Sequence, residues 1–209
     1  MPAKTVRQTI VLASASPRRR ELLRSHGYRV EVQPAHIEEI LPDRASLIAA
    51  VMGPEGDLVA PRFERGCRCF AVVVDGAIAG YGWLSTGPEW IGELQLEIRP
   101  RKGEAYIWNC VTLAAHRRRG VFRSVVAGIA AAARETGATR VWIGSVDVPA
   151  ESALAPIGFA PAAFFWTSRL GRVYTTRARF VGSALGADAR RVLPVRAGLY
   201  GGTVTRRRH

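Results

Sequence analysis

The hydrophobic pattern places one long apolar strand directly before one long apolar helix. Residues 106–113 carry no charge and are rich in β-branched and aromatic types, which predicts a buried strand. From residue 121 to residue 134, Val, Ile and Ala recur at helical spacing without proline, and Gly137 follows as a helix stop. A basic turn, residues 117–120 with the sequence RRRG, joins the two. The chain is therefore predicted to be built around a strand–turn–helix unit.

Other segments alternate or carry turn signals that predict further strands. Asp75-Gly76 is a favoured two-residue hairpin turn between two apolar runs, which should form the middle of a sheet. A strand, a helix that ends near Gly27 and a second strand are predicted before residue 34. The last hairpin should turn at Gly171-Arg172. The strands predicted from residue 67 onward are 67–74, 77–85, 93–98, 104–113, 139–146, 163–170 and 173–181.

The basic turn has the chemistry of a phosphate cradle. A strand, a tight turn and a helix start bring several backbone N–H groups to one point, where the helix dipole favours negative charge. Gly120 allows a close approach of the backbone, and the arginines supply forked donors. The order is neither a Walker loop nor a GxGxxG fingerprint. The alternative is an ordinary turn whose arginines face solvent.

This unit resembles the GNAT family of N-acetyltransferases, in which a V-x-V-like strand end is followed by R/Q-x-x-G-x-G/A. Phe122 stands where the family usually has Gly or Ala. In the family, the backbone amides of this loop hold the pyrophosphate of acetyl-coenzyme A (acetyl-CoA). The residues that the resemblance assigns to the cofactor are Val111, Thr112, Leu113, Arg117, Arg118, Arg119, Gly120, Val121, Phe122 and Arg123.

A second segment extends the resemblance, which covers about residues 67–180. Residues 147–159 resemble the family pattern N-x-x-A-x-x-x-Y-x-x-x-G-F. Asp147 stands at the Asn position, Ala150 at the Ala and Gly158-Phe159 at the end. Leu154 stands at the Tyr that usually protonates the leaving thiolate, and a leucine cannot donate a proton.

The resemblance implies an acetyl-CoA-dependent N-acetyltransferase that acts by direct attack of a primary amine, without an acyl-enzyme. The backbone amides at Val111 and Leu113 would contact the thioester carbonyl. Ser152, Tyr106 or an ordered water would replace the missing acid, and Glu104 would accept the amine's proton through water. The alternative for Glu104 is an exposed residue at a strand end.

The resemblance also implies the fold, an α/β (α+β) architecture with a mixed, mostly antiparallel sheet and helices on both faces. The sheet would open between the strands of Tyr106 and Val141 to admit the pantetheine arm. The transferase domain is expected at residues 41–182, between an N-terminal extension at 1–40 and a C-terminal extension or tail at 183–209. In the family, variable helices at residues 42–66 line the acceptor site, which would place Glu55, Asp57, Arg62 and Glu64 near the substrate; a solvated loop is the alternative.

The N-terminal stretch closely resembles the start of the Maf nucleotide pyrophosphatases. Their S-x-S-x-x-R loop matches Ser14, Ser16 and Arg19. The later acidic and lysine-bearing motifs of that family are not recognisable after Glu39, so a complete pyrophosphatase is not expected. The segment is interpreted as a βαβ-like piece that packs on the transferase core.

The strong positive charge of the chain suggests an anionic partner. The chain has 209 residues, a formal net charge of +13 and a pI near 11.0, which suggests coenzyme A or nucleic acid as an anionic partner. Lys4 and Lys102 are its only lysines, as expected of a bacterial-like, GC-rich coding genome, which weakens the nucleic-acid hypothesis. Arginine clusters at 18–20, 117–119 and 206–208 keep it open. A scaffold that binds coenzyme A without turnover is a further alternative, suggested by Leu154 and Phe122.

Three cysteines without a CxxC pair support neither a disulfide framework nor a metal site. Cys110, in an apolar strand, is expected to be inert packing rather than a nucleophile. Apolar runs are too short to span a bilayer and no signal peptide is evident, so a cytoplasmic protein without membrane contact is expected. Surplus apolar strands make a homodimer reasonable. The acceptor is expected to be a small-molecule or peptide amine.

Overall fold

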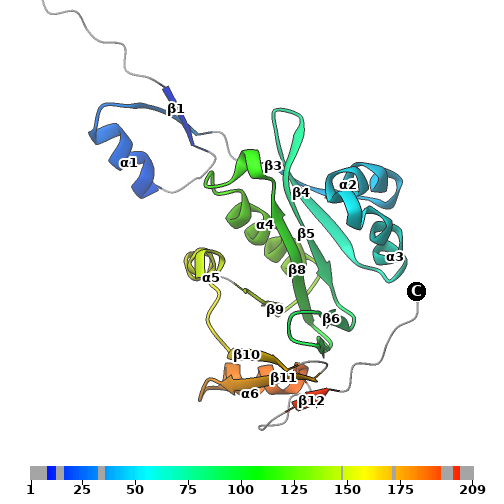
Figure 1. The fold of residues 1–209 in the computed structure, drawn as a ribbon. Helices are drawn as coiled ribbons and strands as arrows, with labels where there is room; N and C mark the ends of the chain where they lie inside the picture. Colours follow the sequence, from blue (N-terminus) through cyan, green and yellow to red (C-terminus); the bar gives the residue numbers. More distant parts are fainter. Residues whose placement is uncertain are drawn as a thin grey trace, which may run out of the picture.

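The computed structural model describes residues 9–12, 17–32, 36–146, 148–170, 173–193 and 200–202. Its main sheet has the strand order β3-β4-β5-β8-β9 (Figure 1). All neighbours pair antiparallel except β8 and β9, which are parallel. The predicted mixed, mostly antiparallel sheet is confirmed. The strands are β3 (His36–Ile40), β4 (Arg68–Val74), β5 (Ala77–Ser85), β8 (Glu104–Thr112) and β9 (Arg140–Ile143).

The hairpin of β4 and β5 forms where Asp75-Gly76 predicts it. Val74 pairs with Ala77, and the two turn residues have φ angles of 51° and 77°. Positive φ at both central positions is the geometry of a type I′ turn, whose twist matches that of the flanking strands. The two strands lie inside the sheet, as expected.

Alternation along the strands divides the core between two faces of the sheet. Phe70 and Val72 of β4 pack with the helix α4 (Val121–Glu135), whereas Cys69 and Ala71 pack with residues of α2 (Ala45–Met52) and α3 (Val59–Glu64). Successive side chains of a strand point to opposite faces, so helices cover both faces. In Figure 1, α2 and α3 lie to the right of the sheet and α4 to its left. The 3-10 turns η1 (Pro42–Arg44) and η2 (Gly53–Leu58) flank α2.

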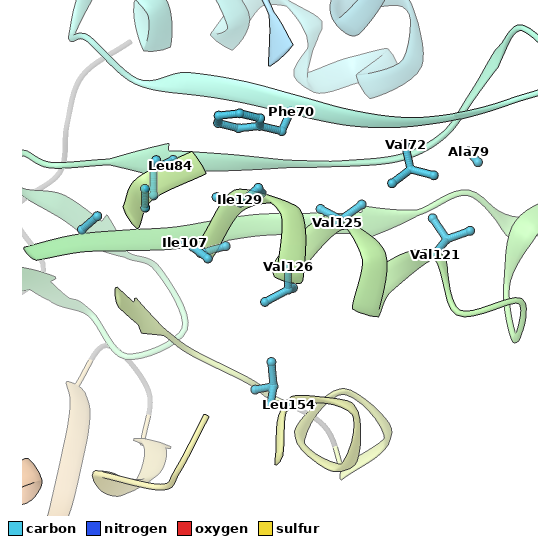
Figure 2. Close-up of a cluster of buried hydrophobic side chains, with 12 residues drawn as sticks. Phe70, Val72, Ala79, Leu84, Ile107, Val121, Val125, Val126, Ile129 and Leu154 are labelled. Atoms are coloured by element: carbon cyan, nitrogen blue, oxygen red, sulfur yellow. The ribbon is translucent and has the colours of Figure 1, made fainter. Parts of the chain in front are cut away.

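The helix α4 packs unusually close to the sheet. A Cβ atom added at Gly82 would lie 2.8 Å from both Cys110 Sγ and Ile129 Cδ1, so only glycine fits there without a shift of its neighbours. Val121, Val125, Val126 and Ile129 of α4 are buried (Figure 2). Full burial of such side chains contributes about 1.5–3 kcal/mol each. The helix start is thereby fixed relative to the end of β8.

A second, three-stranded sheet is formed by the C-terminal part of the chain. The strands β10 (Ala163–Leu170), β11 (Val173–Phe180) and β12 (Tyr200–Gly202) form their own sheet, and α6 (Ala184–Val192) packs Ala189 and Val192 beside Phe180. The predicted last hairpin is confirmed, although its expected turn at Gly171-Arg172 lies outside the described residues. The helix α6 falls within the stretch expected to be a C-terminal tail.

The strand expected at residues 93–98 is wrong over its first half. Only β7 (Leu96–Ile98) is extended, and it pairs with β6 (Glu89–Ile91) in a small separate hairpin. Residues 92–95 form the turn, with Gln95 at φ 51° and its Nε2 donating to the Gly92 carbonyl at 2.6 Å. This local side-chain bond competes with strand pairing.

The N-terminal residues form a βαβ unit. The strands β1 (Thr9–Leu12) and β2 (Arg29–Val32) pair in parallel around α1 (Pro17–Ser25), while β3, also within the expected N-terminal extension, pairs with β4 of the main sheet. Ser14 and Ser16 of the Maf-like loop lie outside the described residues. None of the described helices has both the length and the apolar character needed to cross a membrane.

Candidate functional site

The main sheet opens along one edge of β8. The last paired residues of β9 and β8 are Ile143 and Ile107, but β8 continues to Thr112. Within the described residues, positions 108–112 therefore have β5 on one side and no strand on the other. We call this free side the open edge. It begins where the strands of Tyr106 and Val141 stop pairing, and these are the two strands between which the resemblance implied an opening.

A β-bulge marks the start of the open edge. Trp83 of β5 pairs with Trp108 and Tyr81 pairs with Val111, so β8 carries one extra residue in this interval. Asn109 takes up the excess with a φ of 45°. Its Oδ1 is buried and has no hydrogen-bond partner among the described residues. An unpartnered buried oxygen beside an opening is a feature often found at binding sites.

Alternation identifies the amide that faces the open edge. Leu113 N–H donates to the Ala79 carbonyl of β5 at 3.0 Å, so Leu113 and, two residues before it, Val111 direct their backbone groups toward β5. The N–H of Thr112 consequently points to the open edge. Thr112 is thus the residue whose N–H faces the open edge, whereas Val111 and Leu113, whose amides the resemblance implied for the thioester carbonyl, face β5.

The loop after β8 has many free backbone donors. It runs through η3 (Ala114–His116) and a turn to Gly120, whose φ of 85° is left-handed, and α4 follows at once. The first helical bond is Ser124 N–H to the Gly120 carbonyl, at 3.0 Å. Within the part of the chain that the structure describes, the N–H groups of residues 118–123 make no backbone hydrogen bond, and no side chain caps the helix.

Positive charge surrounds these donors. Arg117, Arg118 and Arg119 are exposed, and no ion pair involves them within the described residues. Arg123 Nε and His116 Nδ1 are buried without a hydrogen-bond partner in the same described part. Free N–H groups, a helix dipole and arginine forks together suit a phosphate or pyrophosphate group.

Phe122 does not obstruct the loop. Its side chain packs against the core cluster that includes Val121 and Val125. The ring therefore adds to the hydrophobic contacts of α4. The resemblance left this position as a departure. The side chain of Phe122 packs into the core, and its backbone N–H lies in the first turn of α4.

Glu104 lies far from the loop. Its Oε2 accepts hydrogen bonds from Arg101 N–H and Trp142 Nε1, both at 3.1 Å, and Arg140 Nη1 lies 3.8 Å from its Oε1. Glu104 is the first residue of β8, so Val111 lies about 23 Å along the strand at about 3.3 Å per residue. The structure does not bring Glu104 together with the residues expected to bind the cofactor.

The candidate acids are also dispersed. The Tyr106 hydroxyl lies 3.6 Å from where a Cβ would stand on Gly144, just past β9, and burial raises the pKa of this phenol. Ser152 is exposed on α5 (Val148–Leu154), which continues into η4 (Ala155–Ile157). Leu154 is buried and points toward Val126 (Figure 2).

The described residues support neither a cysteine nucleophile nor a metal site. Burial raises the pKa of the Cys110 thiol to about 12, so the thiolate needed for nucleophilic attack does not form near neutral pH. No group of three or more His, Cys, Asp or Glu side chains is placed to hold a metal ion in the described part of the chain.

Two family models match the chain. The model of the acetyltransferase (GNAT) family matches residues 37–160, and that of the Maf-like proteins matches residues 9–53. A dTTP/UTP pyrophosphatase of Thermomicrobium roseum is 36% identical over 118 residues, which cover 54% of this chain and 53% of that protein. The chain thus spans about half the length of the curated relative it matches.

Solved structures that the chain resembles include acetyltransferases. A putative acetyltransferase from Agrobacterium tumefaciens is 19% identical and covers 65% of this chain and 99% of its own, with a TM-score of 0.48. A ribosomal-protein-alanine N-acetyltransferase from Brucella melitensis is 17% identical and covers 66% and 98%, with a TM-score of 0.47. Because the match at residues 37–160 spans more than half of the chain and contains both the open edge and the loop, the protein belongs to the acetyltransferase (GNAT) family.

Proposed function

We propose that this protein transfers an acetyl group from acetyl-CoA to a primary amine of an acceptor. The observation that carries the proposal is the run of free N–H groups at residues 118–123, which surrounds Gly120 where β8 ends and α4 begins. The free N–H groups at a helix start are completed by water, by a capping side chain or by an anionic ligand, and no side chain of the described residues caps α4. A pyrophosphate fits this requirement.

Two neighbouring parts of the chain would bind different parts of acetyl-CoA. The N–H groups of Arg118 to Arg123 and the guanidinium groups of Arg117, Arg118 and Arg119 would hold the pyrophosphate, and Arg123 Nε would become a further donor. Beside the loop, the open edge would hold the pantetheine arm, with Thr112 N–H directed to the thioester carbonyl. Val111 and Leu113 support that strand through their pairing with β5.

Acetyl-CoA would supply an acyl group already activated as a thioester. The chain's part is to orient that carbonyl with the Thr112 N–H and to keep competing nucleophiles away. The protonated Cys110 thiol is consistent with direct attack by the amine and no acyl-enzyme. Glu104 as base and Ser152 or Tyr106 as acid stay predictions, and the separation of Glu104 from Val111 along β8 is too long for one bridging water, which counts against Glu104 as the base.

One observation favours a second candidate function, a scaffold that binds coenzyme A without turnover. Leu154 occupies the usual Tyr position and its side chain is enclosed by the core around Val126. No proton donor can reach the leaving thiolate from that position. Binding without transfer to any of a broad panel of amines would favour this candidate.

The first test is calorimetric titration of acetyl-CoA into the purified protein. We expect micromolar binding, and a loss of about tenfold or more in the Arg118→Ala/Arg119→Ala variant, since each removed charge-assisted contact is worth about 1.5–3 kcal/mol. Arg134→Ala is the matched control, because Arg134 is an exposed arginine in the last turn of the same helix. Absence of acetyl-CoA binding by the natural chain would contradict the proposal. If Arg134→Ala weakened binding as much as Arg118→Ala/Arg119→Ala does, the binding would reflect non-specific attraction between charges.

A further inference from the structure

The helix α3 carries an arginine that is buried against the sheet. Arg62 is 5% exposed, and its guanidinium carbon lies 4.6 Å from the ring centroid of Trp108 and 5.1 Å from that of Trp83. Buried arginines are rare unless they are paired. Burial lowers the pKa of Arg62, although its nearest carboxylate, Glu55, acts in the opposite direction.

The donors around Arg62 outnumber their acceptors. Among the described residues its Nη1 donates only to the sulfur of Met52, at 3.7 Å, and its Nη2 lies 3.7 Å from Glu55 Oε2, beyond hydrogen-bond distance. The indole N–H groups of Trp83 and Trp108 are buried and have no partner among the described residues. A buried cation whose donors are not matched is costly for a purely structural group.

This cluster lies beside the open edge. Trp108 immediately precedes Asn109, the residue of the bulge at which β8 loses its partner β9. Arg62, Trp83 and Met52 belong to the face of the sheet that α2 and α3 cover, opposite α4. A group bound at Arg62 would therefore stand on the face of β8 that α2 and α3 cover, where the resemblance implies the acceptor site.

Glu55 shows that a carboxylate has access to Arg62 from solvent. Its side chain is 57% exposed, yet its Oε2 reaches within 3.7 Å of Arg62 Nη2. It belongs to η2, which begins at Gly53 in a left-handed conformation (φ 59°). A better-placed carboxylate could take the position that Glu55 approaches without filling.

We propose that Arg62 binds a carboxylate of the acceptor, which makes the acceptor class amines that also carry a carboxylate. The planar guanidinium fork matches a carboxylate in two parallel hydrogen bonds, and the flanking rings hold it in one orientation. This assignment rests on the proposed acetyl transfer, because it names the acceptor of that reaction. Arg62 binds and selects the substrate and takes no part in the chemical step.

The test pairs each amino acid with its carboxamide. The probes are glycine, β-alanine, γ-aminobutyrate, 6-aminohexanoate and L-lysine, each against the amide that lacks the negative charge. Binding to the protein saturated with coenzyme A is followed by tryptophan fluorescence, since Trp83 and Trp108 flank Arg62. Transfer from acetyl-CoA is followed separately by release of the free thiol. We expect at least one carboxylate to have a KM about tenfold or more below that of its amide.

Three variants make the assignment falsifiable. Arg62→Met keeps an unbranched, flexible side chain but removes the guanidinium group, and it should raise KM for the carboxylate by about tenfold or more, with kcat and acetyl-CoA affinity unchanged and the amide unaffected. Glu55→Gln, at an exposed position, should lower that KM because the competing carboxylate is gone. Arg44→Met is the matched control: Arg44 pairs with Glu38 and is exposed.

The outcomes separate this inference from the proposed function. Carboxylates that bind no better than their amides, or an equal effect of Arg62→Met on both, would overturn the role of Arg62 and leave it as a packing residue. Binding of carboxylates that depends on Arg62, without any acetyl transfer, would support the anchor and contradict the transferase proposal. An increase of KM in Glu55→Gln would also count against the anchor, because it would mean that Glu55 itself holds the acceptor.

Discussion

Gly120 is the residue whose backbone conformation makes the loop possible. Its φ of 85° lies in the left-handed region, which costs an L-residue about 1–2 kcal/mol. The free N–H groups of residues 118–123 depend on this turn, because it separates η3 from α4. Gly120 should therefore matter for binding as well as for stability.

The glycine at the other end of the same helix provides a matched comparison. Gly137 has a φ of 91°, and no atom lies within 4 Å of where its Cβ would be. We expect Gly120→Ala and Gly137→Ala each to lower the free energy of unfolding by about 1 kcal/mol. Only Gly120→Ala should weaken acetyl-CoA binding, by about tenfold, as measured by calorimetry. Equal affinity in the two variants would mean that the loop tolerates another geometry.

At the scale of elements, Arg140 joins β8, β9 and α6. Its guanidinium contacts Glu104 of β8 and Asp188 of α6, and lies 5.4 Å from the ring of Trp142 on its own strand. Trp142 also donates to Glu104. The short strand β9 is thus held at its N-terminal end, while the open edge begins at its C-terminal end.

Glu104→Gln separates a structural carboxylate from a catalytic base. We expect the variant to lower the free energy of unfolding by about 1–3 kcal/mol, because it removes the charge opposite Arg140, and to change kcat by less than about threefold. Asp188→Asn is the control, since it faces the same arginine from α6 and has no expected part in catalysis. A fall in kcat of about 10²-fold or more in Glu104→Gln alone, with loss of the acidic limb of the pH–rate profile, would establish Glu104 as the base.

Elements with strong local signals could be predicted from the sequence, and those decided by tertiary contacts could not. Asp75-Gly76 predicts the hairpin of β4 and β5 because both residues favour the tight turn. The helical spacing of apolar residues predicts α4. The helix α6 was missed because the stretch from Gly182 onward is rich in Gly, Ala and Arg and resembles a tail, although Ala189 and Val192 are buried beside Phe180.

The same distinction applies to the site. The three arginines of the turn and Gly120 predict a phosphate-binding loop from residue type alone. Asn109 was missed because residues 106–113 are uncharged and largely apolar, so there is no clear alternation in which one extra residue would show. The bulge becomes visible only when the registers of two strands are compared. Arg62 was expected near the substrate only by its place in the chain; its burial against Trp83 and Trp108 requires the packed structure.

The whole molecule places several ionisable groups in its apolar interior. Burial raises the pKa of Cys67 to about 11 and the pKa values of Cys69 and Cys110 to about 12, from an ordinary value of 9.0. Burial also raises the pKa values of Tyr81 and Tyr106. In each case the neutral form is favoured in the folded state.

Stability should consequently fall at alkaline pH. Above about pH 9 the unfolded chain loses thiol protons that the folded chain keeps, so the unfolded state binds fewer protons and the free energy of unfolding decreases until the folded thiols titrate near pH 11–12. Each fully titrated thiol contributes about 1.4 kcal/mol per pH unit.

Urea unfolding at pH 8, 9, 10 and 11 measures this slope. Cys69→Ala should have a shallower slope than the natural chain, whatever its stability at pH 8, because one of the titrating thiols is gone. Identical slopes for the two proteins would show that Cys69 titrates alike in the folded and unfolded states.

The free N–H groups of residues 118–123 belong to the main chain, and this determines which sequence changes the loop tolerates. A main-chain donor is the same whichever side chain its residue carries, so a change at Arg117, Arg118 or Arg119 removes the contribution of that guanidinium group and leaves the backbone donors in place. Adding or removing one residue between β8 and α4 would instead rotate the whole series of donors relative to the helix axis. Among natural variants of this chain, the length of the loop should therefore be kept more strictly than its composition.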